Sequence, residues 1–116
     1  MGIVERAILK LSGQLFESEG KQIDFEQYEV VARQIIEIRE QTKVQLAMVV
    51  GGGNIFRGRE ASVGVDRTQA DSMGMLATIM NGIGLREALV RNGAENTRLM
   101  TSINIPQVAE PFILIK

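Results

Sequence analysis

A glycine-rich bend followed by an arginine is the feature of this sequence that most directly suggests chemistry. The apolar pair Val49-Val50 runs into three consecutive glycines at 51–53, and Arg57 follows four residues after the last of them. Glycine allows the close backbone approach that a ring of amides around an anion requires, and a guanidinium holds phosphate oxygens through two parallel hydrogen bonds. Taken alone, such a triplet more often forms a tight strand-to-helix turn, so the phosphate site that we infer needs support from other residues.

A second group of suitable residues supplies that support. Lys10 stands two residues before a Ser12-Gly13 turn, at the end of another short apolar run. Ligands bind outside the carboxyl ends of the strands in open α/β sheets, so two such bends on neighbouring strands would share one edge. Two cations and several amides around one polyphosphate suit phosphoryl transfer, because that reaction needs mainly alignment and neutralisation of charge. The chain contains neither a Walker A string nor a Rossmann glycine fingerprint.

The elements that would position these bends follow the order strand, helix, strand. Residues 7–11 and 44–50 each predict a short strand that ends directly at one of the two bends. Asp24 is the expected N-cap of the intervening helix. Its core stripe has helical spacing and consists of Tyr28, Val31, Ile35 and Ile38. This order predicts an α/β fold in which the two strands are parallel.

A long second helix is expected from Asp71, as its first residue, to a stop at Gly93. Asp71 can serve as an ordinary N-cap or can hydrogen-bond a sugar hydroxyl. We expect the methionines of this helix to fill its core side, and small residues to keep another side thin for close packing, namely Gly74, Ala77, Gly82 and Gly84. Residues 97–103 predict a third strand.

Composition excludes several functional classes. The 116 residues are 45% hydrophobic, which is typical of one globular domain. Their net charge of −1 gives no sign of a basic surface that would bind nucleic acid or an anionic membrane. Cysteine and histidine are both absent, so disulfides, thiolate metal sites and a histidine base are excluded. We see no signal peptide or membrane-spanning run and expect a cytoplasmic protein.

Three runs of the sequence resemble bacterial uridylate kinases, a family with the amino-acid-kinase fold. They are KLSG at 10–13, GGGNIFRG at 51–58 and DRTQADSMGMLATIMNG at 66–82, and the last separates this family from carbamate, glutamate and aspartate kinases. The resemblance implies a three-layer α/β/α fold with a mainly parallel sheet. It implies transfer of the γ-phosphoryl group of ATP to UMP, giving UDP in pyrimidine nucleotide biosynthesis, with Mg²⁺ as the metal and a homohexamer as the assembly.

The resemblance also assigns roles to individual residues. Lys10 would neutralise the transferring phosphoryl group, and the ATP phosphates would be bound by Ser12, Gly13, Gly53 and Arg57. Gly52 would meet the UMP phosphate, and Asp71 the ribose of uridine. No residue of this chain is assigned as a metal ligand.

Members of the family are longer than this chain, and the sequence after Pro111 does not continue in their pattern. We therefore expect residues 1–116 to form the N-terminal, monophosphate-side part of an amino-acid-kinase domain, incomplete on its C-terminal side. The isolated chain is expected to be inactive towards UMP, since a parallel sheet left incomplete exposes an edge and an apolar face. The alternatives are a non-catalytic nucleotide-binding fragment and a kinase of the same fold with a different acceptor.

Overall fold

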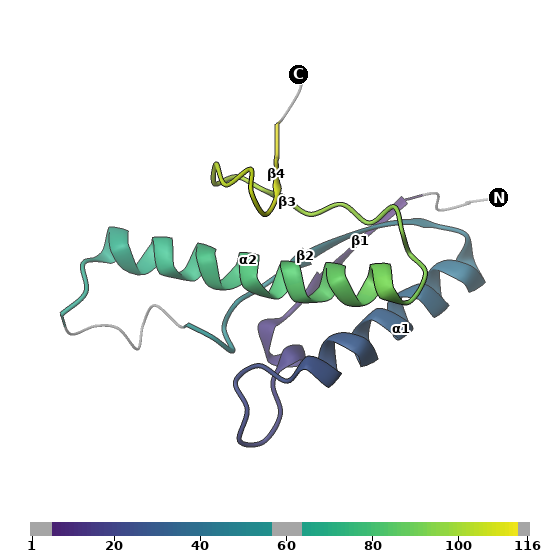
Figure 1. Ribbon diagram of the computed structural model, residues 1–116, viewed down its shortest axis with the longest axis horizontal. Helices are drawn as coiled ribbons and strands as arrows, with labels where there is room; N and C mark the ends of the chain where they lie inside the picture. The colour runs from purple at the N-terminus through teal and green to yellow at the C-terminus, as the bar shows by residue number, and fades with distance from the viewer. Residues whose placement is uncertain (1–5, 57–63, 114–116) are drawn as a thin grey trace.

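The computed structural model describes residues 6–56 and 64–113, and Figure 1 shows the path of the chain. The two longer strands are β1 (Arg6–Leu11) and β2 (Gln45–Val50), and the two helices are α1 (Phe25–Thr42) and α2 (Arg67–Arg91). Shorter elements complete the described chain, namely the 3-10 helix η1 (Gly13–Phe16) and the two-residue strands β3 (Met100–Thr101) and β4 (Glu110–Pro111).

The expected strand, helix and parallel strand are confirmed. Strands β1 and β2 pair in parallel from Arg6 opposite Gln45 to Leu11 opposite Val50, so their carboxyl ends lie level with each other. Between them, Asp24 caps α1, and its carboxylate accepts a hydrogen bond from the amide of Glu26 at 3.0 Å. A hydrogen bond from the Ser18 hydroxyl, together with this cap, holds the pKa of Asp24 below its usual range.

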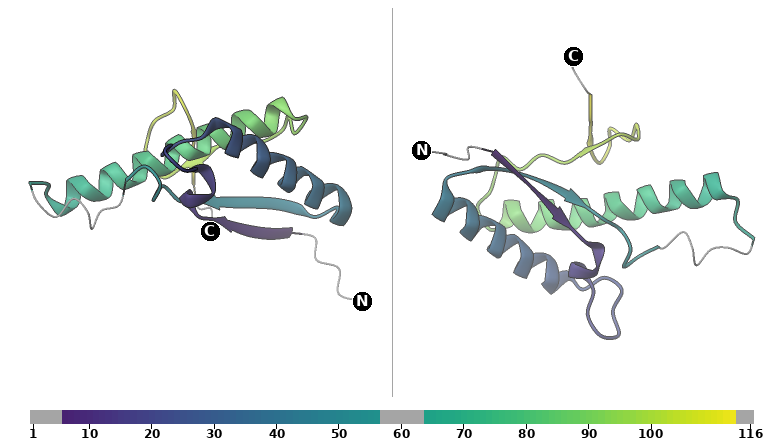
Figure 2. Two further views of the ribbon diagram at one scale, coloured as in Figure 1. Left: turned by 90° about the horizontal axis from the view of Figure 1, so that it is seen from below. Right: turned by 180° about the vertical axis from the view of Figure 1, so that it is seen from behind.

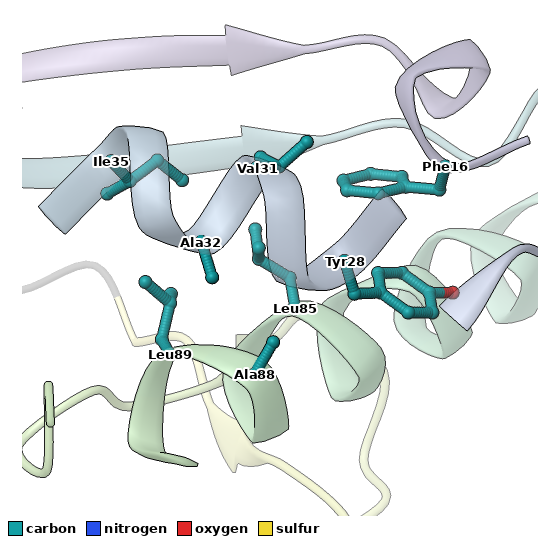
Figure 3. Close-up of a cluster of buried hydrophobic side chains, with 8 residues drawn as sticks. All are labelled: Phe16, Tyr28, Val31, Ala32, Ile35, Leu85, Ala88 and Leu89. Carbon is teal, nitrogen blue, oxygen red and sulfur yellow. The ribbon is translucent and has the colours of Figure 1, made fainter. Parts of the chain in front are cut away.

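One hydrophobic core joins the two helices to one face of the sheet. Figure 3 shows its buried members, which come from η1, α1 and α2: Phe16, Tyr28, Val31, Ala32, Ile35, Leu85, Ala88 and Leu89. Alternate residues of both strands pack against this cluster, namely Leu9, Leu11, Leu46, Met48 and Val50. Ile38 was expected in the same stripe, but it is exposed on the last part of α1.

Both helices lie on the same side of the β1–β2 sheet, as Figure 2 shows in its left view. The opposite face is open, with Ile8 at 70% and Val49 at 55% exposure. The α/β class is therefore confirmed, with one helical layer on the β1–β2 sheet among the described residues. The second helical layer of the three-layer arrangement stays a prediction.

Helix α2 differs from its prediction at its start and on its core side. The helix begins at Arg67 after an N-cap at Asp66, so Asp71 lies inside the helix and caps nothing. The predicted stop is confirmed, since the helix ends at Arg91 and Gly93 follows with φ of 104°. The core side carries alanine, leucine and isoleucine residues, and the methionines Met73, Met75 and Met80 are exposed instead of buried.

The predicted third strand is largely wrong. Only Met100 and Thr101 of residues 97–103 are extended in a ladder, and they pair in parallel with β4 instead of joining β1 or β2. The β3–β4 pair lies on the other side of α2 from α1 in the view of Figure 1.

Candidate phosphate-binding site

The two predicted bends lie against each other, as the parallel pairing requires. The amide of Gly51 donates to the carbonyl of Leu11 at 2.9 Å, which extends the β1–β2 ladder by one bond into the bend. A Cβ atom placed on Gly13 would lie 2.7 Å from the backbone nitrogen of Gly53. Only glycine fits at position 13, because this separation is shorter than real Cβ contacts allow.

A hollow of about 370 Å³ opens at this edge of the sheet. Its lining contains the end of β1, the end of β2 and the first glycine of the bend, namely Lys10, Leu11, Ser12, Val49, Val50 and Gly51. The side chain of Lys10 lies on the open face of the sheet, opposite Val49 in the register. Ser12 caps η1, and its hydroxyl oxygen accepts from the amide of Gln14 at 3.2 Å. The hollow thus combines a cation with a backbone bend, which is the combination that a phosphate group binds.

Helix α2 presses directly on the middle of the glycine bend. A Cβ atom on Gly52 would lie 2.6 Å from the backbone nitrogen of Thr78 and 2.8 Å from the carbonyl carbon of Ala77. The obstacle is helix backbone, which cannot rotate away as a side chain could. The expected close approach of another backbone to the small side of α2 is confirmed at this point.

A buried polar network lies beneath the bend. Asn81 of α2 donates from its amide nitrogen to the carbonyl of Gly51 at 2.9 Å and to the side-chain oxygen of Asn54 at 2.7 Å. Its own oxygen accepts from the hydroxyl of Tyr28 at 2.7 Å, and Asn54 donates onward to the carbonyl of Gln22 at 2.9 Å. Burial raises the pKa of Tyr28, so its hydroxyl stays protonated and remains a donor at neutral pH.

Of the predicted site residues, only Lys10 and Ser12 line the hollow among those that the structure describes, while the predicted glycines lie at the two bends beside it, namely Gly13, Gly52 and Gly53. Asp71 is exposed on α2, seven residues before Thr78, which corresponds to about 10 Å along the axis and nearly the same side of a helix. Asp71 therefore lies on the side of α2 that contacts Gly52, but it does not line the hollow. Arg57 falls outside the described residues.

Residues 5–108 match the amino acid kinase family. The chain belongs to that family. This match covers most of the chain and includes every residue that lines the hollow.

Uridylate kinases are among the similar proteins. The uridylate kinase of Frankia alni is 42% identical over 118 residues, which cover 100% of this chain and 46% of that protein. The uridylate kinase of Mycobacterium sp. (strain KMS) is 42% identical over 115 residues, which cover 98% of this chain and 45% of that protein. These matches confirm the resemblance that the three sequence runs predicted.

Solved structures agree with the sequence relatives. UMP kinase from Bacillus anthracis matches with a TM-score of 0.85 and 39% identity, over 94% of this chain and 45% of that one. UMP kinase from Ureaplasma parvum matches with a TM-score of 0.82 and 35% identity, over 95% of this chain and 48% of that one. The chain spans less than half the length of the relatives that it matches.

Within residues 6–56 and 64–113, no group of three or more aspartates, glutamates, cysteines or histidines gathers around a common point. Within the same ranges, no helix is long and apolar enough to span a bilayer.

Sequence reasoning missed the two asparagines that support this amino-acid-kinase site. Asn81 sits between Ala77 and Leu85 at four-residue spacing, and both of these neighbours are buried. A lone amide at a core position of a helix is a signal of a structural hydrogen bond, because burying it without partners is costly. Asn54 follows the glycines directly and gives no comparable local signal.

Proposed function

We propose that this chain carries the phosphate-binding part of a uridylate kinase, which transfers the γ-phosphoryl group of ATP to UMP and forms UDP. The observation that carries the proposal is the convergence of Lys10, Ser12 and Gly51 on one hollow at the carboxyl edge of β1 and β2. Its substrates are suggested by the 42% identity to uridylate kinases.

In this proposal the ATP phosphates lie along the first bend. Lys10 approaches from the open sheet face and neutralises charge on the transferring phosphoryl group, while Ser12 and Gly13 line the triphosphate. Gly53, whose nitrogen faces Gly13, and Arg57 complete the contacts to ATP. Catalysis then depends on alignment and charge neutralisation, since phosphoryl transfer requires little covalent chemistry from the protein.

In the same proposal UMP lies beside the bend, along the N-terminal half of α2. Gly52 approaches its phosphate, and Asp71, about two helical turns from the Gly52 contact, accepts a hydrogen bond from the ribose. The carboxylate of Asp71 is exposed and thus available to a ligand. The same proposal includes a cytoplasmic enzyme of pyrimidine nucleotide biosynthesis that uses Mg²⁺ and assembles as a homohexamer.

Nucleotide binding by the purified chain tests this proposal first. We expect calorimetry to detect ATP and UMP binding, and Lys10→Ala to weaken ATP binding by about tenfold, as loss of a hydrogen bond to a charged group does. Arg33→Ala is the matched control, because it removes one positive charge from the exposed side of α1. Equal ATP affinity in both variants would exclude Lys10 from the site.

Turnover separates the remaining possibilities. The chain spans less than half of its relatives, so UDP formation is measured for this chain and for a full-length relative under the same conditions. Binding of UMP without UDP formation is the result expected for this chain alone, and UDP formation at a rate near that of the full-length relative would contradict that expectation. Competition of UMP against CMP, carbamate and glutamate identifies a kinase with another acceptor.

A further inference from the structure

The polar side chain of Asn81 is completely buried, at 0% exposure, in the middle of α2. Burying an amide is unfavourable unless its hydrogen-bonding groups are all satisfied. Asn81 meets this condition, because its nitrogen donates twice and its oxygen accepts once. The position lies in line with Ala77 and Leu85, where an apolar side chain would pack without such a requirement.

The two donated bonds go to opposite ends of the glycine bend. One reaches the carbonyl of Gly51, whose amide is already bonded to Leu11, so this residue is held at both of its backbone groups. The other reaches Asn54, the first residue after the triplet. A single amide group therefore connects the entry and the exit of the bend.

Two further bonds fix the orientation of that amide. The carbonyl of Gly51 can only accept, so the nitrogen of Asn81 must face it. The hydroxyl of Tyr28 donates to the oxygen on the other side, and the Phe16 ring, with its centroid 5.0 Å away, packs on the Tyr28 ring. Tyr28 is itself held between helices, since a Cβ atom on Gly84 would lie 2.4 Å from its ring.

Glycine loses more backbone freedom on ordering than any other residue, so a bend of three glycines binds an anion well only if it is fixed beforehand. We propose that Asn81 is a positioning residue that fixes residues 51–54 in the conformation that receives a nucleotide phosphate, and that Tyr28 orients Asn81 for this task. This inference rests on the function proposed above, because it takes the bend to be the phosphate site. Asn81 touches no ligand in this scheme and acts only through the backbone.

Asn81→Asp is the sharpest test. The substitution keeps size and leaves an oxygen for Tyr28, but it replaces both donors with an oxygen that faces the oxygens of Gly51 and Asn54. Asn92→Asp is the matched control, since Asn92 is the C-cap of the same helix and donates to Glu29 at 2.8 Å and to the carbonyl of Ala88 at 2.7 Å instead of to the bend.

Three quantities are measured for both variants: the UMP dissociation constant, the stability in urea, and the exchange rates of backbone amides 51–54 by NMR. We expect Asn81→Asp to weaken UMP binding by about tenfold or more and to accelerate exchange selectively at 51–54, while Asn92→Asp changes neither. Equal UMP affinity and equal exchange at 51–54 in the two folded variants would overturn the positioning role.

The exchange measurement needs no ligand, so it also separates this inference from the proposed function. Selective loosening of 51–54 in a chain that does not bind UMP supports the positioning role and counts against the function. If Asn81→Asp does not fold, Tyr28→Phe decides, because it keeps both donors of Asn81 and removes only the orienting bond. Faster exchange at 51–54 in Tyr28→Phe than in the unmodified chain supports the inference, and unchanged exchange there overturns it.

Discussion

The two faces of the β1–β2 sheet differ both in composition and in surroundings. On one face, Leu9, Met48 and their neighbours pack against the core cluster of both helices. On the other, Ile8 and Val49 are mostly exposed. Parallel strands are normally covered on both sides and are apolar throughout for that reason. The helix-covered face is apolar at every position, whereas the open face combines apolar residues with three polar ones, namely Arg6, Lys10 and Gln45.

The largest loss in the free energy of unfolding is expected from a substitution in the core on the helix-covered face. Phe16 is fully buried, and replacing it with alanine removes a large side chain from the core cluster. We expect Phe16→Ala to lower the free energy of unfolding by about 3–5 kcal/mol in urea denaturation, enough to unfold much of a chain of this size.

The same substitution at Phe112 is the control, because that side chain is 60% exposed. Phe112→Ala is expected to change the free energy of unfolding by no more than about 0.5 kcal/mol. Similar losses at both positions would mean that the packed region is not confined to the helix-covered side of the sheet.

Substitutions of glycine by alanine show whether a position has room for a methyl group, and they change no large side chain. Gly52→Ala places a methyl group 2.6 Å from the backbone of α2. We expect a loss of about 1–3 kcal/mol in the free energy of unfolding, since helix and bend must move apart.

Gly74→Ala is expected to have the opposite sign. Gly74 lies inside a regular helix, and among the residues that the structure describes a Cβ atom there meets only the ring of Phe56, at the ordinary contact distance of 3.9 Å. Alanine should therefore raise the free energy of unfolding by about 0.5–1 kcal/mol through the lower backbone entropy of the unfolded chain. A loss at Gly74 as large as at Gly52 would show that α2 packs differently along its length.

The sequence predicted those features that depend on neighbouring residues. The cap at Asp24, the stripe from Tyr28 to Ile35 and the two strands ending at glycine bends all follow from local spacing, and the structure confirms them. The end of α2 before Gly93 was also predicted from the sequence, because a positive φ angle after a helix favours glycine.

Features that depend on contacts between particular distant side chains were not predicted. The side of α2 that faces the core is chosen by its contact with Tyr28 and the glycine bend, so the apolar methionines were assigned to the wrong side. Asn81 finds its partners 30, 27 and 53 residues away in the chain. Periodicity within a helix cannot report such pairings, because it describes only neighbours within a few turns.

The smallest effect is expected on the open face of the sheet. It tests directly whether this face is exposed in solution. Ile8→Thr keeps a β-branched side chain but reduces apolar surface at a position that is 70% exposed. We expect the free energy of unfolding to change by less than about 0.5 kcal/mol at low protein concentration. A loss above about 1 kcal/mol would mean that the face is covered in solution. Repeating the urea titration over a range of concentrations then identifies copies of the chain as the cover, because only self-association makes stability depend on concentration.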